Sequence, residues 1–129
     1  MGTENFTLIP NGIPSIQERI DLVHTYGVCK GKIDSRTMVD VCSTNVAKQF
    51  NMFPRKGALV VGSDADIVVY DTDYVGTFKH EDGLSKIDYC GFEGMERKGR
   101  SDVVFLRGKV VAEQGKFVGE TGSGIYLPR

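Results

Sequence analysis

Residues 54–71 read Pro-Arg-Lys-Gly-Ala-Leu-Val-Val-Gly-Ser-Asp-Ala-Asp-Ile-Val-Val-Tyr-Asp, in which two apolar runs flank a short polar turn. The runs, residues 58–61 and 67–70, each consist of apolar or aromatic residues without a break. Short apolar runs bounded by glycine, serine and aspartate are typical of β-strands. Pro54 cannot continue a helix. The chain is therefore predicted to change from helical to β structure at this point.

The residues before Pro54 show helical spacing. Their apolar positions and capping residues predict three short amphipathic helices, over residues 15–27, 35–42 and 43–51. Ser15 and Glu18 match a capping box, in which the serine hydroxyl accepts a hydrogen bond from the Glu18 amide and the glutamate reaches back. Asn51 suits a left-handed helix end.

The residues after Pro54 show strand signals. About six short strands are predicted, over residues 58–61, 67–70, 75–78, 102–106, 109–113 and 116–118. Arg107 and Gly108 are predicted to close a hairpin. Residues 79–95 are predicted to be irregular because glycines interrupt them, and the basic cluster 96–100 is interpreted as a solvated loop. The tail, residues 119–129, is predicted to be extended.

This order of elements predicts an α+β chain in which the helices precede the sheet. An amphipathic helix must bury its apolar stripe, and the helical part of the chain contains no strands against which to do so. The helices therefore need a partner outside the first 53 residues.

Six segments resemble, in matching order, the dihydropyrimidinase/D-hydantoinase family of cyclic amidohydrolases. They are residues 6–12, 43–48, 53–57, 62–66, 92–95 and 107–111. The resemblance covers essentially the whole chain, and Phe92-Glu93-Gly94-Met95 narrows it to the cyclic-amide branch. It implies an α+β fragment, with the C-terminal end of a (β/α)8 barrel over residues 1–53, part of a small β-sandwich over 54–118, and an extended tail over 119–129.

The resemblance also implies a chemistry. Family members open the ring amide of 5,6-dihydropyrimidines or hydantoins to N-carbamoyl amino acids, using two divalent metals, commonly zinc, and a carboxylated lysine. Those ligands are expected upstream of Met1, so this chain is expected to hold no catalytic or metal-binding residue, to bind no cofactor and to be inactive alone. The implied partners are the rest of the barrel, a small cyclic amide substrate and further copies in a tetramer.

One site residue carries over from the resemblance. The family's Ile-Pro-Asn-Gly loop contacts the ring amide of the substrate through the main chain of its asparagine, which is Asn11 here. Gly12 lets the backbone approach a ligand closely. On the residues alone, a simple turn at Pro10-Asn11-Gly12 is the plainer interpretation. The family match favours the substrate loop.

Two other functions stay open. Non-catalytic dihydropyrimidinase-related proteins, which act as oligomeric scaffolds, resemble the chain nearly as well and share the ending of residues 122–129. They tend to carry an acidic residue at the position of Asn11 and a long basic tail after Arg129, so Asn11 favours the enzyme branch. The third hypothesis is an independent small module that associates through exposed apolar residues, namely Ile16, Ile20, Met38 and Phe50.

Composition excludes several classes of partner. The chain has 129 residues and a net charge of -1, so neither a nucleic-acid partner nor an anionic membrane is expected. It contains no apolar run of the ~20 residues that a membrane span needs, and its N-terminus lacks a signal-peptide pattern. A cytoplasmic location is therefore expected. The three cysteines are predicted to be reduced and mostly buried thiols.

Other chemically active residues favour structural interpretations. His24 and His80 lie far apart in the sequence without a third ligand, so ordinary core or surface positions are favoured over metal binding. Asp64 and Asp66 are interpreted as residues that cap a tight turn rather than as an acid/base pair. Ser43 is interpreted as a helix cap rather than a nucleophile.

Overall fold

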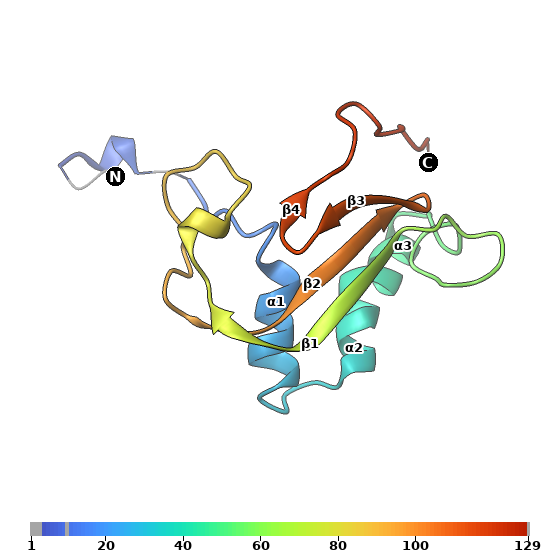
Figure 1. The fold of residues 1–129 in the computed structure, drawn as a ribbon, viewed down its shortest axis with the longest axis horizontal. Coiled ribbons are helices and arrows are strands. Elements are labelled where there is room, and N and C mark those ends of the chain that lie inside the picture. The colour runs from blue at the N-terminus through green and yellow to red at the C-terminus, as the bar shows by residue number, and fades with distance from the viewer. Residues whose placement is uncertain (1–3, 10, 129) are drawn as a thin grey trace.

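The computed structural model describes residues 4–9 and 11–128, and it shows helices followed by a four-stranded antiparallel sheet (Figure 1). A short 3-10 helix, η1 (Phe6–Leu8), precedes the two longer helical segments. The fold is α+β with the helices before the sheet, as predicted. In the described residues, no helix has the length and apolar character needed to cross a membrane.

The first helix runs without a break from α1 (Arg19–Val23) into the π-helical segment η2 (His24–Val28). The predicted capping box is wrong, because the N-cap is Glu18 and it makes no side-chain capping hydrogen bond. Residues 16–18 form a turn instead, and Gln17 in this turn bonds to residues 82 and 84. This long-range attachment fixes the chain before α1 in place of a local cap.

The second helix joins two predicted helices into one. It consists of α2 (Ser35–Val39), the π-helical segment η3 (Asp40–Thr44) and α3 (Asn45–Gln49). Ser43 and Thr44 therefore lie inside the helix and not at a cap, and the Thr44 hydroxyl donates to the Gly57 carbonyl at 2.9 Å. The true N-cap is Asp34, which accepts from the Thr37 amide at 2.7 Å, and this hydrogen bond lowers the pKa of Asp34. Asn51 has a φ of 56°, which confirms the predicted left-handed end.

The sheet has the strand order β1-β2-β3-β4, with the strands β1 (Ile67–Thr77), β2 (Glu96–Leu106), β3 (Lys109–Glu113) and β4 (Lys116–Phe117). The β2–β3 hairpin turns at Arg107 and Gly108, whose φ values are 49° and 78°, as predicted. The predicted strands 67–70 and 75–78 are one strand with two register shifts, so the prediction of six short strands was too fragmented. Residues 79–95 are irregular apart from the 3-10 helix η4 (His80–Asp82), as predicted.

The predicted strand at residues 58–61 is wrong. These residues are irregular, and Leu59, Val60 and Val61 are exposed. A strand needs a neighbour for its backbone N–H and C=O groups, and none of the four described strands pairs with this run. The apolar pattern identified a segment suited to a sheet, but the described chain provides no strand beside it.

The basic residues 96–100 belong to β2, which corrects the interpretation of a solvated loop. Arg97 Nη2 lies 2.6 Å from Asp21 Oδ2, and the two side chains are only 18% and 5% exposed. Gly99 is buried beside the ring of Tyr70. We call this contact between the first helix and the sheet the α1–β2 joint; it consists of Asp21, His24, Thr25, Tyr70, Arg97 and Gly99.

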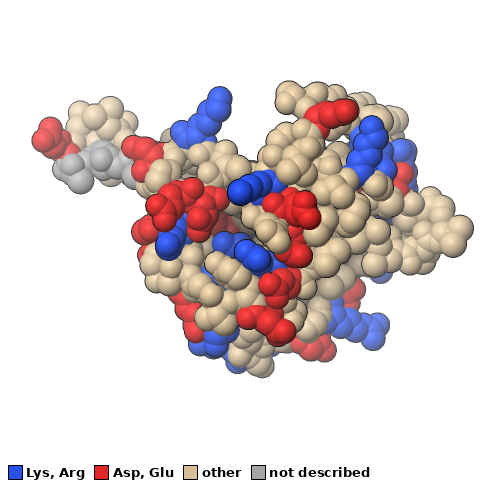
Figure 2. Space-filling model, viewed as in Figure 1, with Lys and Arg blue, Asp and Glu red and all other residues tan. Residues whose placement is uncertain are grey.

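Much apolar surface stays uncovered. In the described part of the chain, the buried apolar residues are Met38, Ala47 and Phe78, while a larger set is exposed, including Leu59, Val60, Val61, Val68, Val69, Val75, Phe117 and Ile125. Figure 2 shows acidic and basic residues intermingled on one face, without a broad area of a single sign. Exposed apolar area of this extent indicates a surface that packs against another polypeptide segment.

Two predictions about individual side chains need correction. Of the four apolar residues expected to be exposed, Ile16 and Phe50 are exposed, whereas Met38 is buried and Ile20 is half-buried. Met38 is buried because α2 packs against η2. The three cysteines are unpaired but are not mostly buried: Cys29 is exposed and the other two are half-buried.

Candidate functional site

The Asn11 loop, residues 11–13, is an exposed turn that precedes α1. Pro10, the first residue of the possible turn Pro10-Asn11-Gly12, lies outside the described residues. Gly12 has a φ of 87°, which favours glycine, and a Cβ placed there would have nothing within 4 Å. Among the described residues, the main-chain N–H and C=O of Asn11 have no backbone hydrogen-bond partner. These groups are therefore open to a ligand.

The irregular 79–95 segment lies against this loop (Figure 1). The Tyr89 hydroxyl donates to the Gly12 carbonyl at 3.3 Å. A Cβ on Gly91 would lie 2.7 Å from Ile13 Cγ2, so the isoleucine methyl occupies the space that a larger residue would fill. The two segments therefore touch at consecutive residues of the Asn11 loop.

Gln17 fastens the same 79–95 segment just before α1. Its Nε2 donates to the Asp82 carbonyl at 3.1 Å, and its Oε1 accepts from the Leu84 amide at 2.8 Å. A hollow of about 550 Å³ lies between residues 14–18 and the 79–95 segment, with a mainly apolar lining that includes Ile16, Ile87 and Tyr89. Residues 14–18 and the 79–95 segment thus line an open apolar recess beside the Asn11 loop.

The α1–β2 joint has a different electrostatic character. The Tyr70 hydroxyl donates to Asp21 Oδ1 at 2.9 Å, on the carboxylate that also pairs with Arg97. Burial raises the pKa of Asp21, and the Arg97 charge opposes that rise. Burial and the adjacent carboxylate raise the pKa of Tyr70. Because these groups mainly satisfy one another, the joint is a structural contact and not an open binding site.

The two histidines occupy different parts of the fold. His24 Nδ1 lies 2.7 Å from the Lys98 carbonyl in the joint, whereas His80 is exposed in η4 and its backbone N–H donates to Glu93 at 2.6 Å. Over residues 4–9 and 11–128, no three His, Cys, Asp or Glu side chains gather as metal ligands would. These described residues therefore do not fit a dinuclear metal centre.

Asp64 and Asp66 both pair with the same lysine, and their role is structural. Lys56 Nζ lies 2.9 Å from Asp64 and also pairs with Asp66, and Arg55 adds a second contact to Asp64 at 3.1 Å. The hydrogen bond from Lys56 lowers the pKa of Asp64. Asp66 also accepts from the Arg107 amide at 2.8 Å. The pair therefore joins the turn before β1 to the β2–β3 hairpin, and the predicted capping of its own turn was too local.

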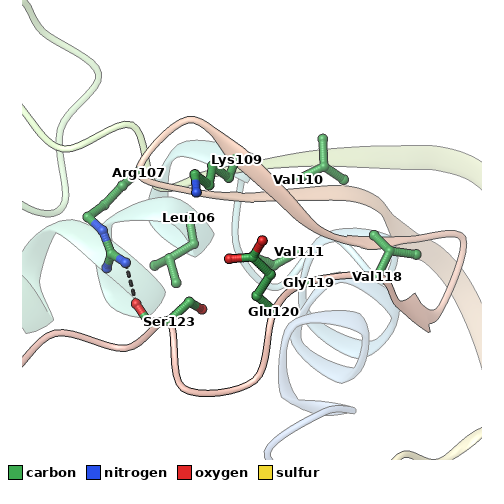
Figure 3. Close-up of a pocket in the computed structure, with 9 residues that line it drawn as sticks. All are labelled: Leu106, Arg107, Lys109, Val110, Val111, Val118, Gly119, Glu120 and Ser123. Atoms are coloured by element: carbon green, nitrogen blue, oxygen red, sulfur yellow. Dashed lines mark hydrogen bonds between the residues drawn. The ribbon is translucent and has the colours of Figure 1, made fainter.

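A second hollow, of about 440 Å³, separates the β2–β3 hairpin from the tail (Figure 3). The Arg107 guanidinium points at the tail and donates to the Ser123 carbonyl, while Lys109 and Glu120 line the same hollow from its two sides. The tail beyond β4 contains no helix or strand as far as residue 128, and it turns at residues 121–122. Arg107 holds this tail to the sheet.

Three residues that shape these sites gave no sequence signal. Gln17 and Tyr89 stand in segments predicted as a helix start and as an irregular loop, and neither belongs to a motif. Asp21 lies in a helical pattern, with its partner Arg97 on a distant strand. Each acts through a contact between residues far apart in the chain, which local spacing does not reveal.

Comparison with known families defines the class of protein. The profile of the amidohydrolase family matches residues 9–111, and the chain belongs to this family. Within the family, it is 40% identical to the D-hydantoinase of Geobacillus stearothermophilus over 129 residues, which is 100% of this chain and 27% of that protein. It is 38% identical to dihydropyrimidinase-related protein 5 of Homo sapiens, over 99% of this chain and 23% of that protein.

The fold agrees with that relationship. The D-hydantoinase (dihydropyrimidinase) from Thermus sp. superimposes with a TM-score of 0.89 and 53% identity, over 96% of this chain and 27% of that one. The chain therefore spans about a quarter of the length of the relatives that it matches, and its helices and sheet correspond to part of the larger hydantoinase fold.

Proposed function

We propose that these residues form the C-terminal segment of a metal-dependent cyclic amidohydrolase that hydrolyses the ring amide of 5,6-dihydropyrimidines or hydantoins to N-carbamoyl amino acids. The observation that carries the proposal is the match to D-hydantoinases of the entire chain in sequence and of 96% of it in fold. In this proposal, residues 1–53 complete a (β/α)8 barrel, residues 54–118 contribute to a β-sandwich, and residues 119–129 form a tail that contacts a neighbouring subunit of a tetramer.

The segment contributes to substrate binding through the main chain of Asn11. A ring amide presents one C=O acceptor and one N–H donor side by side, and a main-chain N–H and C=O are complementary to them. The exposed main chain of Asn11, which has no backbone hydrogen-bond partner among the described residues, supports this role. Because Gly12 has no side chain, the substrate ring can approach the backbone closely.

The metal chemistry belongs to residues outside this segment. Amidohydrolases are generally metal-dependent, and the described residues do not gather a donor set of their own. In the complete enzyme, residues outside this segment, a carboxylated lysine among them, would hold two divalent metals, which would activate water for attack on the ring amide. The segment alone is inactive, and its work is to complete the fold and to present the Asn11 backbone to the substrate.

The exposed apolar residues supply the surface for the rest of the barrel and sandwich. Ile16 before α1 is 88% exposed, and Val61 beyond the helices is fully exposed. Strand β1 is one of the two outer strands of the described sheet and carries exposed Val68, Val69 and Val75. An outer strand with uncovered valines is a typical place for a further strand to pair.

A non-catalytic scaffold protein is the second candidate. Its support is the 38% identity to dihydropyrimidinase-related protein 5, close to the value for the D-hydantoinase. Asn11 favours the enzyme, because an acidic residue at this position would place a negative charge where a neutral ring amide has to bind.

A segment exchange tests the two candidates. The 129 residues replace the matching part of the Geobacillus stearothermophilus D-hydantoinase, and a control chimera carries the matching segment of dihydropyrimidinase-related protein 5. We expect the first chimera to hydrolyse hydantoin and dihydrouracil when zinc is bound, and the isolated chain to show no turnover. Metal-dependent turnover by the isolated chain, or a folded and zinc-loaded chimera without activity, would overturn the proposal.

A further inference from the structure

The 79–95 segment places a tyrosine hydroxyl on the loop that the proposed function assigns to the substrate. The Tyr89 O–H donates to the Gly12 carbonyl at 3.3 Å, and the half-buried ring lines the apolar hollow beside it. In the described structure this is a contact between residues 77 positions apart. Tyr89 therefore joins the Asn11 loop to the 79–95 segment. In the proposed function, this segment itself makes no main-chain contact with the substrate.

Glycine has more backbone freedom than any other residue, so a contact from outside is needed to fix its torsions. Gly12 has a φ of 87° and nothing within 4 Å of its Cβ position, so neither a side chain nor close packing there restricts its backbone torsions. The orientation of the Asn11–Gly12 peptide depends on these torsions. The hydrogen bond from Tyr89 to the Gly12 carbonyl fixes the peptide plane between Gly12 and Ile13. The packing of Ile13 beside Gly91 fixes the position of Ile13 itself.

We propose that Tyr89 is a positioning residue for the ring-amide contact, because its hydroxyl holds the Gly12 carbonyl and so orients the main-chain groups of Asn11. This role rests on the proposed function, since the Asn11 main chain contacts a substrate only in a cyclic amidohydrolase. Tyr89 acts through Gly12 and does not itself touch the reacting atoms.

The kinetic effect of this role falls on substrate binding. Main-chain bonds to the ring amide hold the substrate in the ground state and in the transition state alike, so loosening them raises KM and leaves kcat nearly unchanged. A neutral hydrogen bond contributes a factor of about 2 to 13 to an equilibrium in proteins. The Tyr89 bond is exposed and long, so its effect belongs in the lower part of that range.

Tyr89→Phe in the active chimera measures the effect. We expect KM for hydantoin and dihydrouracil to rise about 2- to 5-fold, with kcat changed by less than about 2-fold. The matched control is Tyr26→Phe, which removes another tyrosine hydroxyl that donates to a backbone carbonyl, that of Glu96 at 3.1 Å, away from the Asn11 loop. Its KM should equal that of the parent chimera. An unchanged KM in Tyr89→Phe overturns the role of Tyr89.

A double mutant separates positioning through Gly12 from a direct effect on the hollow. Gly12→Ala strains the backbone at a φ of 87° without any steric contact, so it disturbs the loop alone. If Tyr89 acts through Gly12, Tyr89→Phe adds little to the KM of Gly12→Ala. Fully additive effects of the two substitutions would contradict that coupling.

Hydrogen exchange keeps the test independent of activity. The Leu84 amide, which donates to Gln17 between the two segments, should exchange faster in Tyr89→Phe than in Tyr26→Phe, because the Asn11 loop and the 79–95 segment have lost one of their attachments. Equal exchange shows that Tyr89 does not hold the loop. A folded parent chimera without turnover overturns the proposed function, whereas an active chimera with an unchanged KM overturns only the inference about Tyr89.

Discussion

The α1–β2 joint and the Asn11 loop are held in place by different means. In the joint, the buried Asp21 carboxylate pairs with the Arg97 guanidinium and accepts from the Tyr70 phenol, and the His24 imidazole lies within hydrogen-bond distance of the Lys98 carbonyl. The Asn11 loop is held by one long, exposed hydrogen bond from Tyr89 and by the packing of Ile13 beside Gly91, and Gln17 fastens the 79–95 segment through two further exposed bonds. The comparison shows where stability is concentrated and where the backbone stays free to adjust to a ligand.

Arg97→Met tests the joint and should give the largest effect. The substitution keeps an apolar side chain of similar length but leaves the Asp21 carboxylate buried beside Tyr70 without its cation. Removing one partner of a buried ion pair costs about 3–5 kcal/mol of unfolding free energy. Denaturant unfolding of the zinc-loaded chimera measures this loss. The control is Arg36→Met in the exposed pair with Asp40, with an expected loss below about 0.5 kcal/mol.

The loss caused by Arg97→Met should grow with pH. Burial raises the pKa of Asp21 above its ordinary value of 3.8, so the folded chain binds a proton there more readily than the unfolded chain does. Ionisation of Asp21 therefore reduces stability as the pH rises from the unfolded pKa through the folded one, and Arg97 offsets part of that reduction. Without Arg97, the folded pKa rises further. Equal losses at pH 5 and pH 8 would contradict this account.

Gly99→Ala examines the packing of the same joint. Gly99 has a φ of 79°, and an added Cβ would lie 2.6 Å from Tyr70 Cε1 and 2.8 Å from His24 Nδ1. We expect a loss of about 2–4 kcal/mol, from backbone strain and overpacking together. Gly115→Ala is the matched control, because its φ is 80° and a Cβ there meets nothing within 4 Å. The control measures the backbone strain alone, about 1–2 kcal/mol of unfolding free energy. Equal losses in Gly99→Ala and Gly115→Ala would show that the joint is loosely packed.

The same contrast explains what the sequence could predict. The hairpin at Arg107-Gly108 and the helix end at Asn51 were predicted correctly because turn and cap chemistry is local. The role of residues 96–100 was missed because it depends on Asp21, which comes from the opposite end of the chain. The strand predicted at residues 58–61 failed for a related reason, since an apolar run does not specify its partner strand.

The candidate site shows the same limit. The resemblance supplied Asn11, and the structure leaves its main chain open, while its contact with substrate stays a prediction. Gln17 and Tyr89 were not predicted, because a glutamine and a tyrosine in irregular segments have no spacing that marks them as contacts of a loop.

Gln17→Leu addresses the weakly held region and should have the smallest global effect. Leucine matches the size of glutamine but removes the bonds to the Asp82 carbonyl and the Leu84 amide. Both bonds are exposed, so water replaces them, and the expected loss of unfolding free energy is below about 1 kcal/mol. The local effect is larger: exchange of the Leu84 amide should quicken, while amides of the α1–β2 joint keep their protection.

Gln49→Leu, at an exposed position at the end of α3, is the control for the added apolar surface. Slower or unchanged exchange at Leu84 in Gln17→Leu would mean that the 79–95 segment holds itself in place. A global loss as large as that of Arg97→Met would remove the distinction between the two regions. A small loss of unfolding free energy together with fast exchange at Leu84 would show that the two regions have separate roles. The α1–β2 joint would then hold the first helix on the sheet. The 79–95 segment then opens and closes over the Asn11 backbone at little cost to the fold.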